Sequence, residues 1–313
     1  MAVSPKVKAI ISSMERTFPK VDDSMTAPEL RRLIHEAASG VIPGEPEPVA
    51  HVEDLAVPGA LGDIPIRIYR PESAPAQGSP AMVFMHGGGF VLCDLDSHDD
   101  LCRSLANASG AVYVAVDYHL APEHPFPGPV EDCYAVLQWV AANASELGVD
   151  DARLGVFGDS AGGGLAAAVA LMTRDRSGPA LRLQVLVYPM LDTACDTPSH
   201  VNTGEGYFLK SEEVQWYWKR YLADASDAAD PYASPTQADD LTGLPITLII
   251  TAENDPLRDE GEAYGEALSK AGVEVTVRRY EGMFHSFLSF LAELDEAVEA
   301  RDQIGAEVRR ALA

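Results

Sequence analysis

Positive charge is scarce in this 313-residue chain, which has 23 lysine and arginine residues against 48 aspartate and glutamate residues. The formal net charge of −25 would repel nucleic acid and anionic membrane surfaces, so we expect neither as a partner. A small neutral or apolar substrate fits this charge better. A salty habitat and plain solubility explain the excess of acid equally well.

Cysteine is also rare, and long hydrophobic runs are absent. The cysteines Cys93, Cys102, Cys133 and Cys195 are far apart and form neither a Cys-X-X-Cys pair nor a zinc-ligand spacing. We therefore expect buried reduced thiols and no metal. No stretch could span a bilayer, and the N-terminus lacks a signal-peptide core, which predicts a cytoplasmic protein without membrane insertion.

Polar linkers are absent too, so a single domain over residues 1–313 is expected. Continuous apolar runs, typical of strands buried on both faces, alternate with helical segments. The expected strands are 81–85, 111–116, 154–157, 183–188, 246–251 and 273–280, and the helices between and after them are 99–108, 130–142, 163–173, 259–271 and 292–312. The pattern predicts an α/β fold with a mostly parallel central sheet and flanking helices.

Two segments fall outside this alternation. Residues 1 to about 45 predict two helices, the second of which begins with a capping box of Thr26 and Glu29 and ends at Gly40, and 51–70 predict a hairpin. The segment at about 192–230 is too long for a simple crossover and contains an aromatic helix at 211–222. We expect the N-terminal helices and this insertion to form a helical cap over the active site.

The motif Gly-Asp-Ser-Ala-Gly at 158–162 lies between a predicted strand and a small-residue helix. This context favours a nucleophile elbow, in which Ser160 occupies a strained turn between flanking glycines, over an ordinary glycine-rich turn. The helix that begins at Ala161 would point its free N–H groups at negative charge that forms at Ser160. Ser160 is therefore the predicted nucleophile.

A serine hydroxyl needs a base, and the base needs an orienting acid. His285 follows the last predicted strand and is the only histidine in the C-terminal third, so its position fits the chain order Ser, acid, His. Asp255 follows the strand at 246–251 and is the predicted acid. Asp192, Glu253 and Asp259 remain alternatives.

A glycine-rich loop, His-Gly-Gly-Gly-Phe at 86–90, comes straight after the strand at 81–85. Such a loop supplies backbone N–H donors to a tetrahedral intermediate. The predicted oxyanion hole consists of the N–H groups of Gly87, Gly88 and Ala161, while His86 is expected to support the loop.

Five motifs in this order resemble those of the hormone-sensitive-lipase family of α/β-hydrolases, in the branch with a Gly-Asp-Ser-Ala-Gly elbow. They lie at 86–90, 118–123, 158–163, 255–261 and 285–287. The resemblance implies an α/β-hydrolase fold and a carboxylesterase without cofactors, with Ser160, Asp255 and His285 as the catalytic triad. One departure is His119, where the family usually has arginine, so any ion pair which that arginine makes would be absent.

The expected reaction is hydrolysis of esters with short to medium acyl chains through an acyl-Ser160 intermediate. An amidase, a deacetylase or a lipase of the same superfamily remains an alternative, as does a non-catalytic binding relative, against which His285 weighs. A homodimer is left open. The acids at 94–100 are interpreted as helix caps in preference to a metal site. The aromatic residues Trp216, Tyr217, Trp218 and Tyr221 either line an acyl pocket or simply pack their helix.

Overall fold

A computed structural model describes residues 3–39 and 45–313 of this protein. Within these residues, eight strands form one sheet in the order β1-β2-β4-β3-β5-β6-β7-β8. The strands are β1 (His51–Pro58), β2 (Asp63–Arg70), β3 (Ser79–Met85), β4 (Val112–Val116), β5 (Val149–Asp159), β6 (Leu181–Val187), β7 (Ile246–Asn254) and β8 (Val275–Phe284). β2 pairs antiparallel with β1 and β4, and every other pair is parallel. The predicted mostly parallel α/β sheet is confirmed.

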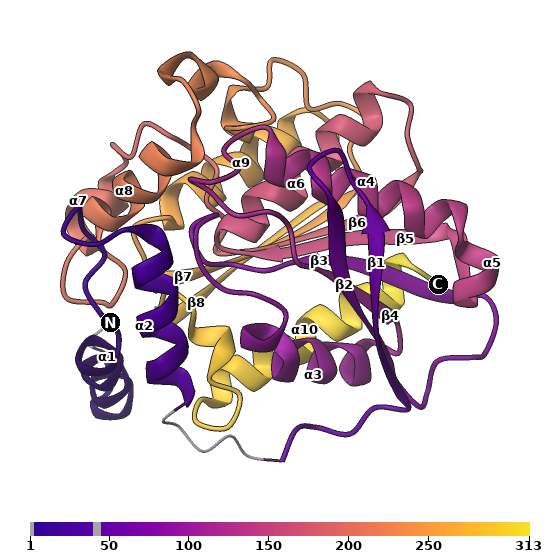
Figure 1. Cartoon of the computed structure of the whole chain (residues 1–313), viewed down its shortest axis with the longest axis horizontal. Coiled ribbons are helices and arrows are strands. Elements are labelled where there is room, and N and C mark those ends of the chain that lie inside the picture. Colours follow the sequence, from indigo (N-terminus) through magenta and orange to yellow (C-terminus); the bar gives the residue numbers. More distant parts are fainter. Residues whose placement is uncertain (1–2, 40–44) are drawn as a thin grey trace.

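Helices cover both faces of this sheet (Figure 1). One face carries α4 (Gly128–Ala142), α6 (Ala161–Asp175) and α9 (Arg258–Lys270), and the other carries α3 (Asp99–Ser109) and α10 (Asp295–Ala311). The short α5 (Ala144–Leu147) leads from α4 into β5. Each face has its own hydrophobic core, so the sheet is buried on both sides.

Strand β3 is apolar at every position from Ala81 to Met85 because both of its faces are buried. Neighbouring side chains on a strand point to opposite faces, so Val83 joins one core and Phe84 the other, and both are fully buried. β2 lies next to the exposed outer strand β1 and instead alternates from Asp63 to Ile68, with Ile64, Ile66 and Ile68 buried and the residues between them more exposed. The predicted hairpin is confirmed by the β1–β2 pairing.

Several strands extend beyond the apolar runs that predict them, β5 and β8 among them. β5 begins at Val149, which pairs with Ser79, and passes through exposed acidic residues before its buried part. β8 continues to Phe284 and ends directly before His285. The apolar pattern identifies only the part of a strand that is buried, because backbone pairing alone leaves no hydrophobic signal.

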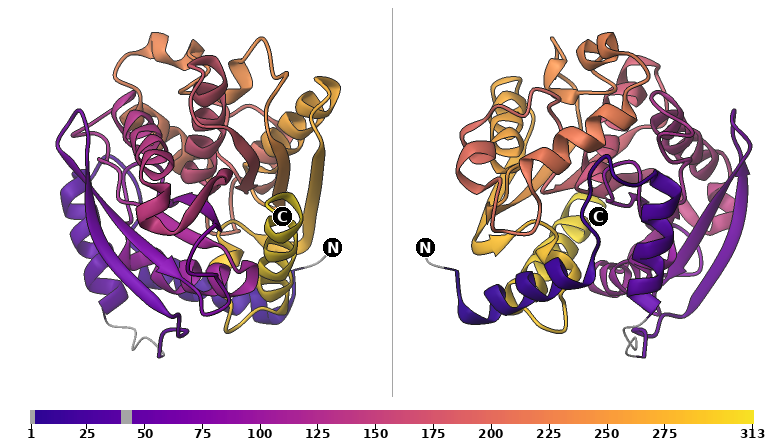
Figure 2. Two further views of the ribbon diagram at one scale, coloured as in Figure 1. Left: turned by 90° about the vertical axis from the view of Figure 1, so that its right-hand side faces the viewer. Right: turned by 60° about the vertical axis from the view of Figure 1, so that its left-hand side comes forward.

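The predicted N-terminal helices are α1 (Pro5–Thr17) and α2 (Ala27–Ser39). The capping box is confirmed, since the Thr26 N–H donates to the Glu29 carboxylate at 2.9 Å. Gly40 lies outside the described residues. These helices lie at the same end of the sheet as α7 (Pro198–Thr203) and the aromatic helix α8 (Ser211–Tyr221) (Figures 1 and 2).

Specific contacts connect the N-terminal segment with the segment that carries α7 and α8. The rings of Phe18 and Phe208 are 6.5 Å apart, and Arg220 donates to Asp23 at 2.6 Å. Short 3-10 turns complete the chain: η1 (Asp96–His98), η2 (Ala225–Ala229), η3 (Pro235–Gln237) and η4 (Phe287–Ser289). None of the helices in the described ranges has the length and apolar character of a membrane-spanning segment.

Candidate active site

Ser160 stands alone between the end of β5 and the start of α6, as the elbow motif predicts. Its backbone has φ 54° and ψ −122°, a conformation that non-glycine residues rarely adopt. Two hydrogen bonds fix this turn to the chain around the end of β6: the Ser160 N–H donates to the Val187 carbonyl at 2.8 Å, and the Met190 N–H donates to the Ser160 carbonyl at 3.0 Å. The surrounding structure therefore enforces the strained backbone conformation of Ser160.

The two glycines that flank Ser160 are required by space. A Cβ atom on Gly158 would overlap the carbonyl of Gly162, and a Cβ on Gly162 would overlap the carbonyl of Met85 at the end of β3. Only glycine lets β5 turn so sharply while α6 lies against the sheet.

The structure brings the predicted base and acid together at this turn. His285 Nε2 lies 2.9 Å from Ser160 Oγ, and His285 Nδ1 lies 2.8 Å from Asp255 Oδ2. Asp255 is fully buried, and His285 and Ser160 are 3% and 8% exposed. This arrangement lets one ring nitrogen accept the serine proton while the other donates to the carboxylate.

Asp255 is itself held by the loop between β7 and α9. Its Oδ1 accepts the Leu257 N–H at 2.9 Å, which leaves Oδ2 for the histidine. The Asn254 side chain donates to the Met283 carbonyl at 3.1 Å and thereby ties the end of β7 to the end of β8, directly before His285. Acid and base are positioned from two neighbouring strands.

The alternative acids are engaged elsewhere. Asp192 accepts the Ala194 N–H at 3.0 Å, Glu253 accepts the Gly282 N–H at 2.6 Å, and Asp259 accepts the Ser199 N–H at 2.8 Å. Among the described residues, the carboxylate that accepts a hydrogen bond from the His285 ring is that of Asp255.

The predicted role of the Gly87 N–H in the oxyanion hole is corrected by its hydrogen bond. Its N–H donates to Asp159 Oδ1 at 2.9 Å, so it is not free to bind an oxyanion as predicted from the sequence. The next two glycines have left-handed backbones, with φ 115° at Gly88 and 62° at Gly89. Within the part of the chain that the structure describes, their N–H groups donate to no protein acceptor. The Ala161 N–H opens α6 and is unused by the helix.

Asp159 was not predicted as a site residue, although it lies within the elbow motif. It is 3% exposed, and His98 Nε2 lies 3.4 Å from the same Oδ1 atom. Burial raises the pKa of the Asp159 carboxyl, but His98, His86 and the Gly87 N–H together outweigh burial and lower it. The ionised carboxylate thus anchors the glycine loop beside the nucleophile.

His86 supports the same loop, as expected. Its ring stacks on Tyr118 with the centroids 4.3 Å apart, and the Tyr118 hydroxyl donates to the His86 carbonyl at 2.7 Å. Burial lowers the pKa of His86 to about 4, so the ring is neutral at neutral pH. His86 is therefore no competitor for the role of base.

Helix α8 packs on the glycine loop at 86–90. The Tyr217 ring lies so close to Gly89 that a Cβ atom there would overlap it, and Phe90 stacks on Tyr221 with the centroids 3.8 Å apart. Tyr217 is 8% exposed. The aromatic residues of α8 therefore pack against the loop next to the nucleophile.

Two further segments differ in part from expectation. His119, which replaces the arginine usual in the resembled family, retains an acidic partner because its Nδ1 lies 2.6 Å from Asp132 Oδ2. In the acidic 94–100 segment, Asp94 caps a turn by accepting the Ser97 N–H at 2.9 Å. Asp99 binds Arg67 and Arg103.

Comparisons with known proteins agree with this geometry. A family model described as "alpha/beta hydrolase fold" matches residues 82–289. A carboxylic ester hydrolase, LipN, of Mycobacterium tuberculosis is 43% identical over 86% of this chain and 72% of that protein. An ethyl acetate hydrolase of Pseudomonas putida is 36% identical over 96% of each chain. The solved structure of a hyperthermophilic esterase from the archaeon Pyrobaculum calidifontis superimposes with a TM-score of 0.94, at 42% identity over 100% of both chains.

The family assignment follows from the matched length and from the identities over most of the chain. This chain belongs to the α/β-hydrolase fold family, in its hormone-sensitive-lipase branch.

Proposed function

We propose that this protein is a carboxylesterase that hydrolyses small neutral esters with short to medium acyl chains. The observation that carries the proposal is the buried line from Ser160 Oγ through the His285 ring to Asp255, with distances of 2.9 and 2.8 Å. Relatives that are named as esterases, including the carboxylesterase NlhH of Mycobacterium tuberculosis at 37% identity over 99% of this chain, support it.

In the proposed mechanism, Ser160 Oγ attacks the ester carbonyl carbon while His285 Nε2 takes its proton. Asp255 stabilises the imidazolium and orients the ring. The N–H groups of Gly88, Gly89 and Ala161 bind the oxyanion, each contributing about 3–4 kcal/mol to the transition state. Collapse of the intermediate expels the alcohol, which takes the proton from His285.

Water then repeats the sequence on the acyl-enzyme. His285 takes a proton from water, the hydroxide attacks the acyl carbon, and the second tetrahedral intermediate releases the carboxylic acid and returns the proton to Ser160. Every proton and electron pair is balanced within the triad, the ester and water, so the proposed reaction needs no metal or cofactor.

The expected substrate class follows from the net charge of the protein and from the packing of α8 over the glycine loop. A net charge of −25 disfavours anionic substrates and nucleic acid. Tyr217 of α8 packs on Gly89 of the glycine loop, so we expect α8 to limit the length of the acyl chain that fits. Each buried methylene adds roughly 0.8 kcal/mol until that limit is reached. We expect p-nitrophenyl esters of about four to eight carbons to be cleaved best, with a steep loss by about sixteen carbons.

A reducing compartment such as the cytoplasm fits the four cysteines, all of which are free thiols. Size-exclusion chromatography of the purified protein tests for a homodimer.

Ester and amide series with purified protein, each measured alongside Ser160→Ala, test the proposal. We expect ester turnover that Ser160→Ala abolishes, together with a single fluorophosphonate label at Ser160. Labelling of another residue would contradict the nucleophile. A monotonic rise in efficiency out to sixteen carbons, or activation on emulsions, would favour a lipase, and equal efficiency on amides would favour an amidase.

A further inference from the structure

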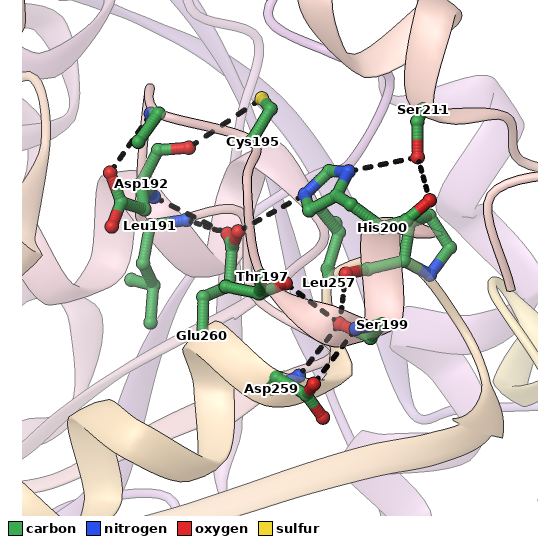
Figure 3. A network of polar contacts seen from close by, with 12 residues as sticks. Leu191, Asp192, Cys195, Thr197, Ser199, His200, Ser211, Leu257, Asp259 and Glu260 are labelled. Carbon is green, nitrogen blue, oxygen red and sulfur yellow. Dashed lines mark hydrogen bonds and ion pairs between the residues drawn. The ribbon is translucent and has the colours of Figure 1, made fainter. Parts of the chain in front are cut away.

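A buried polar network runs from the start of α9 to the start of α8 (Figure 3). It begins at Glu260, which is 2% exposed. Its Oε1 atom accepts the N–H of Leu191 at 2.6 Å and that of Asp192 at 3.3 Å. Glu260 thereby binds the backbone that follows β6, close to the Met190 N–H that donates to Ser160.

The other oxygen of Glu260 faces His200 on α7. Glu260 Oε2 and His200 Nε2 are 3.6 Å apart, and their side chains are 1% and 2% exposed. Among the described residues, neither of these two atoms has a hydrogen-bond partner. Two buried polar atoms therefore point at each other across a short gap (Figure 3).

The contact between His200 and the Ser211 hydroxyl determines which ring nitrogen of His200 carries a proton. The Ser211 hydroxyl donates to the His200 carbonyl at 2.8 Å, which uses its single proton. His200 Nδ1 lies 3.0 Å from the same hydroxyl oxygen and must donate to it. In the neutral ring, Nε2 is then an acceptor.

An ionised Glu260 would place an acceptor opposite this acceptor. The pair is satisfied only when one proton lies between Oε2 and Nε2, whether it is formally on the carboxyl or on the ring. Burial raises the pKa of the Glu260 carboxyl to about 7, against the opposing effects of His200 and the Leu191 N–H. Among the described residues, other titratable groups near the pair come from the loop after β6 and from α9: Asp192, Cys195, Asp196 and Asp259.

This polar network joins both sides of the active site. Ser199, beside His200, donates through its hydroxyl to the Pro256 carbonyl at 2.6 Å, directly after the acid Asp255. Ser211 is the first residue of α8. Further along α8, Tyr217 packs on Gly89. The position of α8 over the glycine loop is therefore connected through His200 to the loop that carries the acid.

We propose that Glu260 and His200 are a proton-sharing positioning pair that seats α7 and α8 over the active site and so governs substrate binding. The pair touches no reacting atom, and its role rests on the proposed esterase function. Loss of the shared proton at alkaline pH leaves two acceptors in contact and loosens α8. KM should then rise while kcat for a small ester changes little.

Steady-state kinetics with p-nitrophenyl butyrate between pH 6 and 9 test this pair. The wild-type KM should rise roughly tenfold across the alkaline limb, as expected when a buried acceptor loses its partner. In Glu260→Gln, the amide oxygen still accepts both backbone N–H groups and the NH₂ donates to His200 at every pH, so KM should stay low and flat. Glu260→Ala should give a high, pH-independent KM.

Glu262→Gln is the matched control, because Glu262 lies on the same helix but binds Thr251 and Arg279 away from the pair. It should reproduce the wild-type pH profile. A flat wild-type KM up to pH 9, or a Glu260→Gln variant as impaired as Glu260→Ala, would overturn the proposal.

A second measurement separates this proposal from the esterase function. Trp216 and Trp218 lie on α8, so their fluorescence emission reports the seating of the helix without any substrate. We expect a titration in the wild-type protein that Glu260→Gln abolishes and Glu262→Gln retains. If that result appears in a protein that cleaves no ester, the pair stands and the proposed function fails. If esters are cleaved but the emission does not titrate, the pair fails.

Discussion

The carboxylate of Asp159 accepts the N–H of Gly87 at 2.9 Å, so the residue before the nucleophile fixes the loop opposite it. Replacement of Asp159 by alanine should release the glycine loop and misplace the Gly88 and Gly89 N–H groups. Because loss of one oxyanion donor costs a factor of 10² to 10³, we expect kcat to fall roughly 10- to 100-fold, with a smaller change in KM.

Steady-state kinetics of Asp159→Ala with p-nitrophenyl butyrate measure this effect. The exposed Asp151 on the same strand is the control, and Asp151→Ala should have wild-type kcat. An unchanged kcat in folded Asp159→Ala would show that the loop keeps its position without the carboxylate.

Asp255→Asn should reduce kcat by about 10³- to 10⁴-fold while KM changes little, because the asparagine favours the wrong tautomer of His285. Asp192→Asn is the comparison, since the Asp192 carboxylate accepts the N–H of the nearby Ala194. Parallel kinetics of the two variants measure the difference. An equal fall in kcat for both variants would show that Asp255 is not the specific acidic partner of His285.

Arg31 ties α2 to the body of the protein. It donates to the Glu123 carboxylate at 2.7 Å and to the carbonyls of Val91 and Ala121 at 2.6 and 2.7 Å. We expect Arg31→Ala to lower the free energy of unfolding by about 1–2 kcal/mol, a value reduced for the partial exposure of the ion pair.

Urea unfolding measures this loss, and the neighbouring Arg32 supplies the control. Its exposed pair with Glu36 lies within one helix, so Arg32→Ala should cost less than about 0.5 kcal/mol. Equal destabilisation by the two variants would mean that the contacts of Arg31 with the chain beyond α2 contribute nothing.

Protonation of the buried His86 ring should make the free energy of unfolding depend on pH. Burial lowers its pKa from 6.5 to about 4, so the folded state disfavours the protonated ring. The stabilising contribution of the neutral ring is complete above the unfolded pKa of 6.5 and is lost as the pH falls from there through about 4. The free energy of unfolding should therefore decline across this window.

Unfolding midpoints of His86→Gln, measured between pH 7 and 4, should fall less steeply than those of the wild type. His51→Gln is the control, because His51 is exposed on the outer strand β1 and should leave the slope unchanged. Parallel curves for wild type and His86→Gln would rule out this source of acid sensitivity.

The residues of the proposed triad are predictable because each follows a strand whose apolar run is visible in the sequence. Ser160, Asp255 and His285 come after β5, β7 and β8, and the carboxyl ends of parallel strands meet at one edge of the sheet. The capping box at Thr26 is equally local, since both partners lie within one turn.

The supporting contacts are not predictable in this way. His98 meets Asp159, and His200 meets Glu260, across segments far apart in the chain, and spacing gives no signal for such pairs. Gly87 shows a related limit. A glycine loop indicates that donors are available, but the direction of each N–H depends on backbone angles and on the acceptor that the fold places nearby.

The strained backbone conformation of Ser160, the proposed nucleophile, lowers the stability of the fold. A side chain at φ 54° and ψ −122° costs about 1–3 kcal/mol, whereas glycine adopts this conformation freely and loses about 0.5–1 kcal/mol through its greater unfolded-state entropy. An inactive chain with glycine at position 160 should consequently withstand heat better than the active one. Screening for thermal resistance alone would discard the serine, so directed evolution of this scaffold needs turnover in every round of selection.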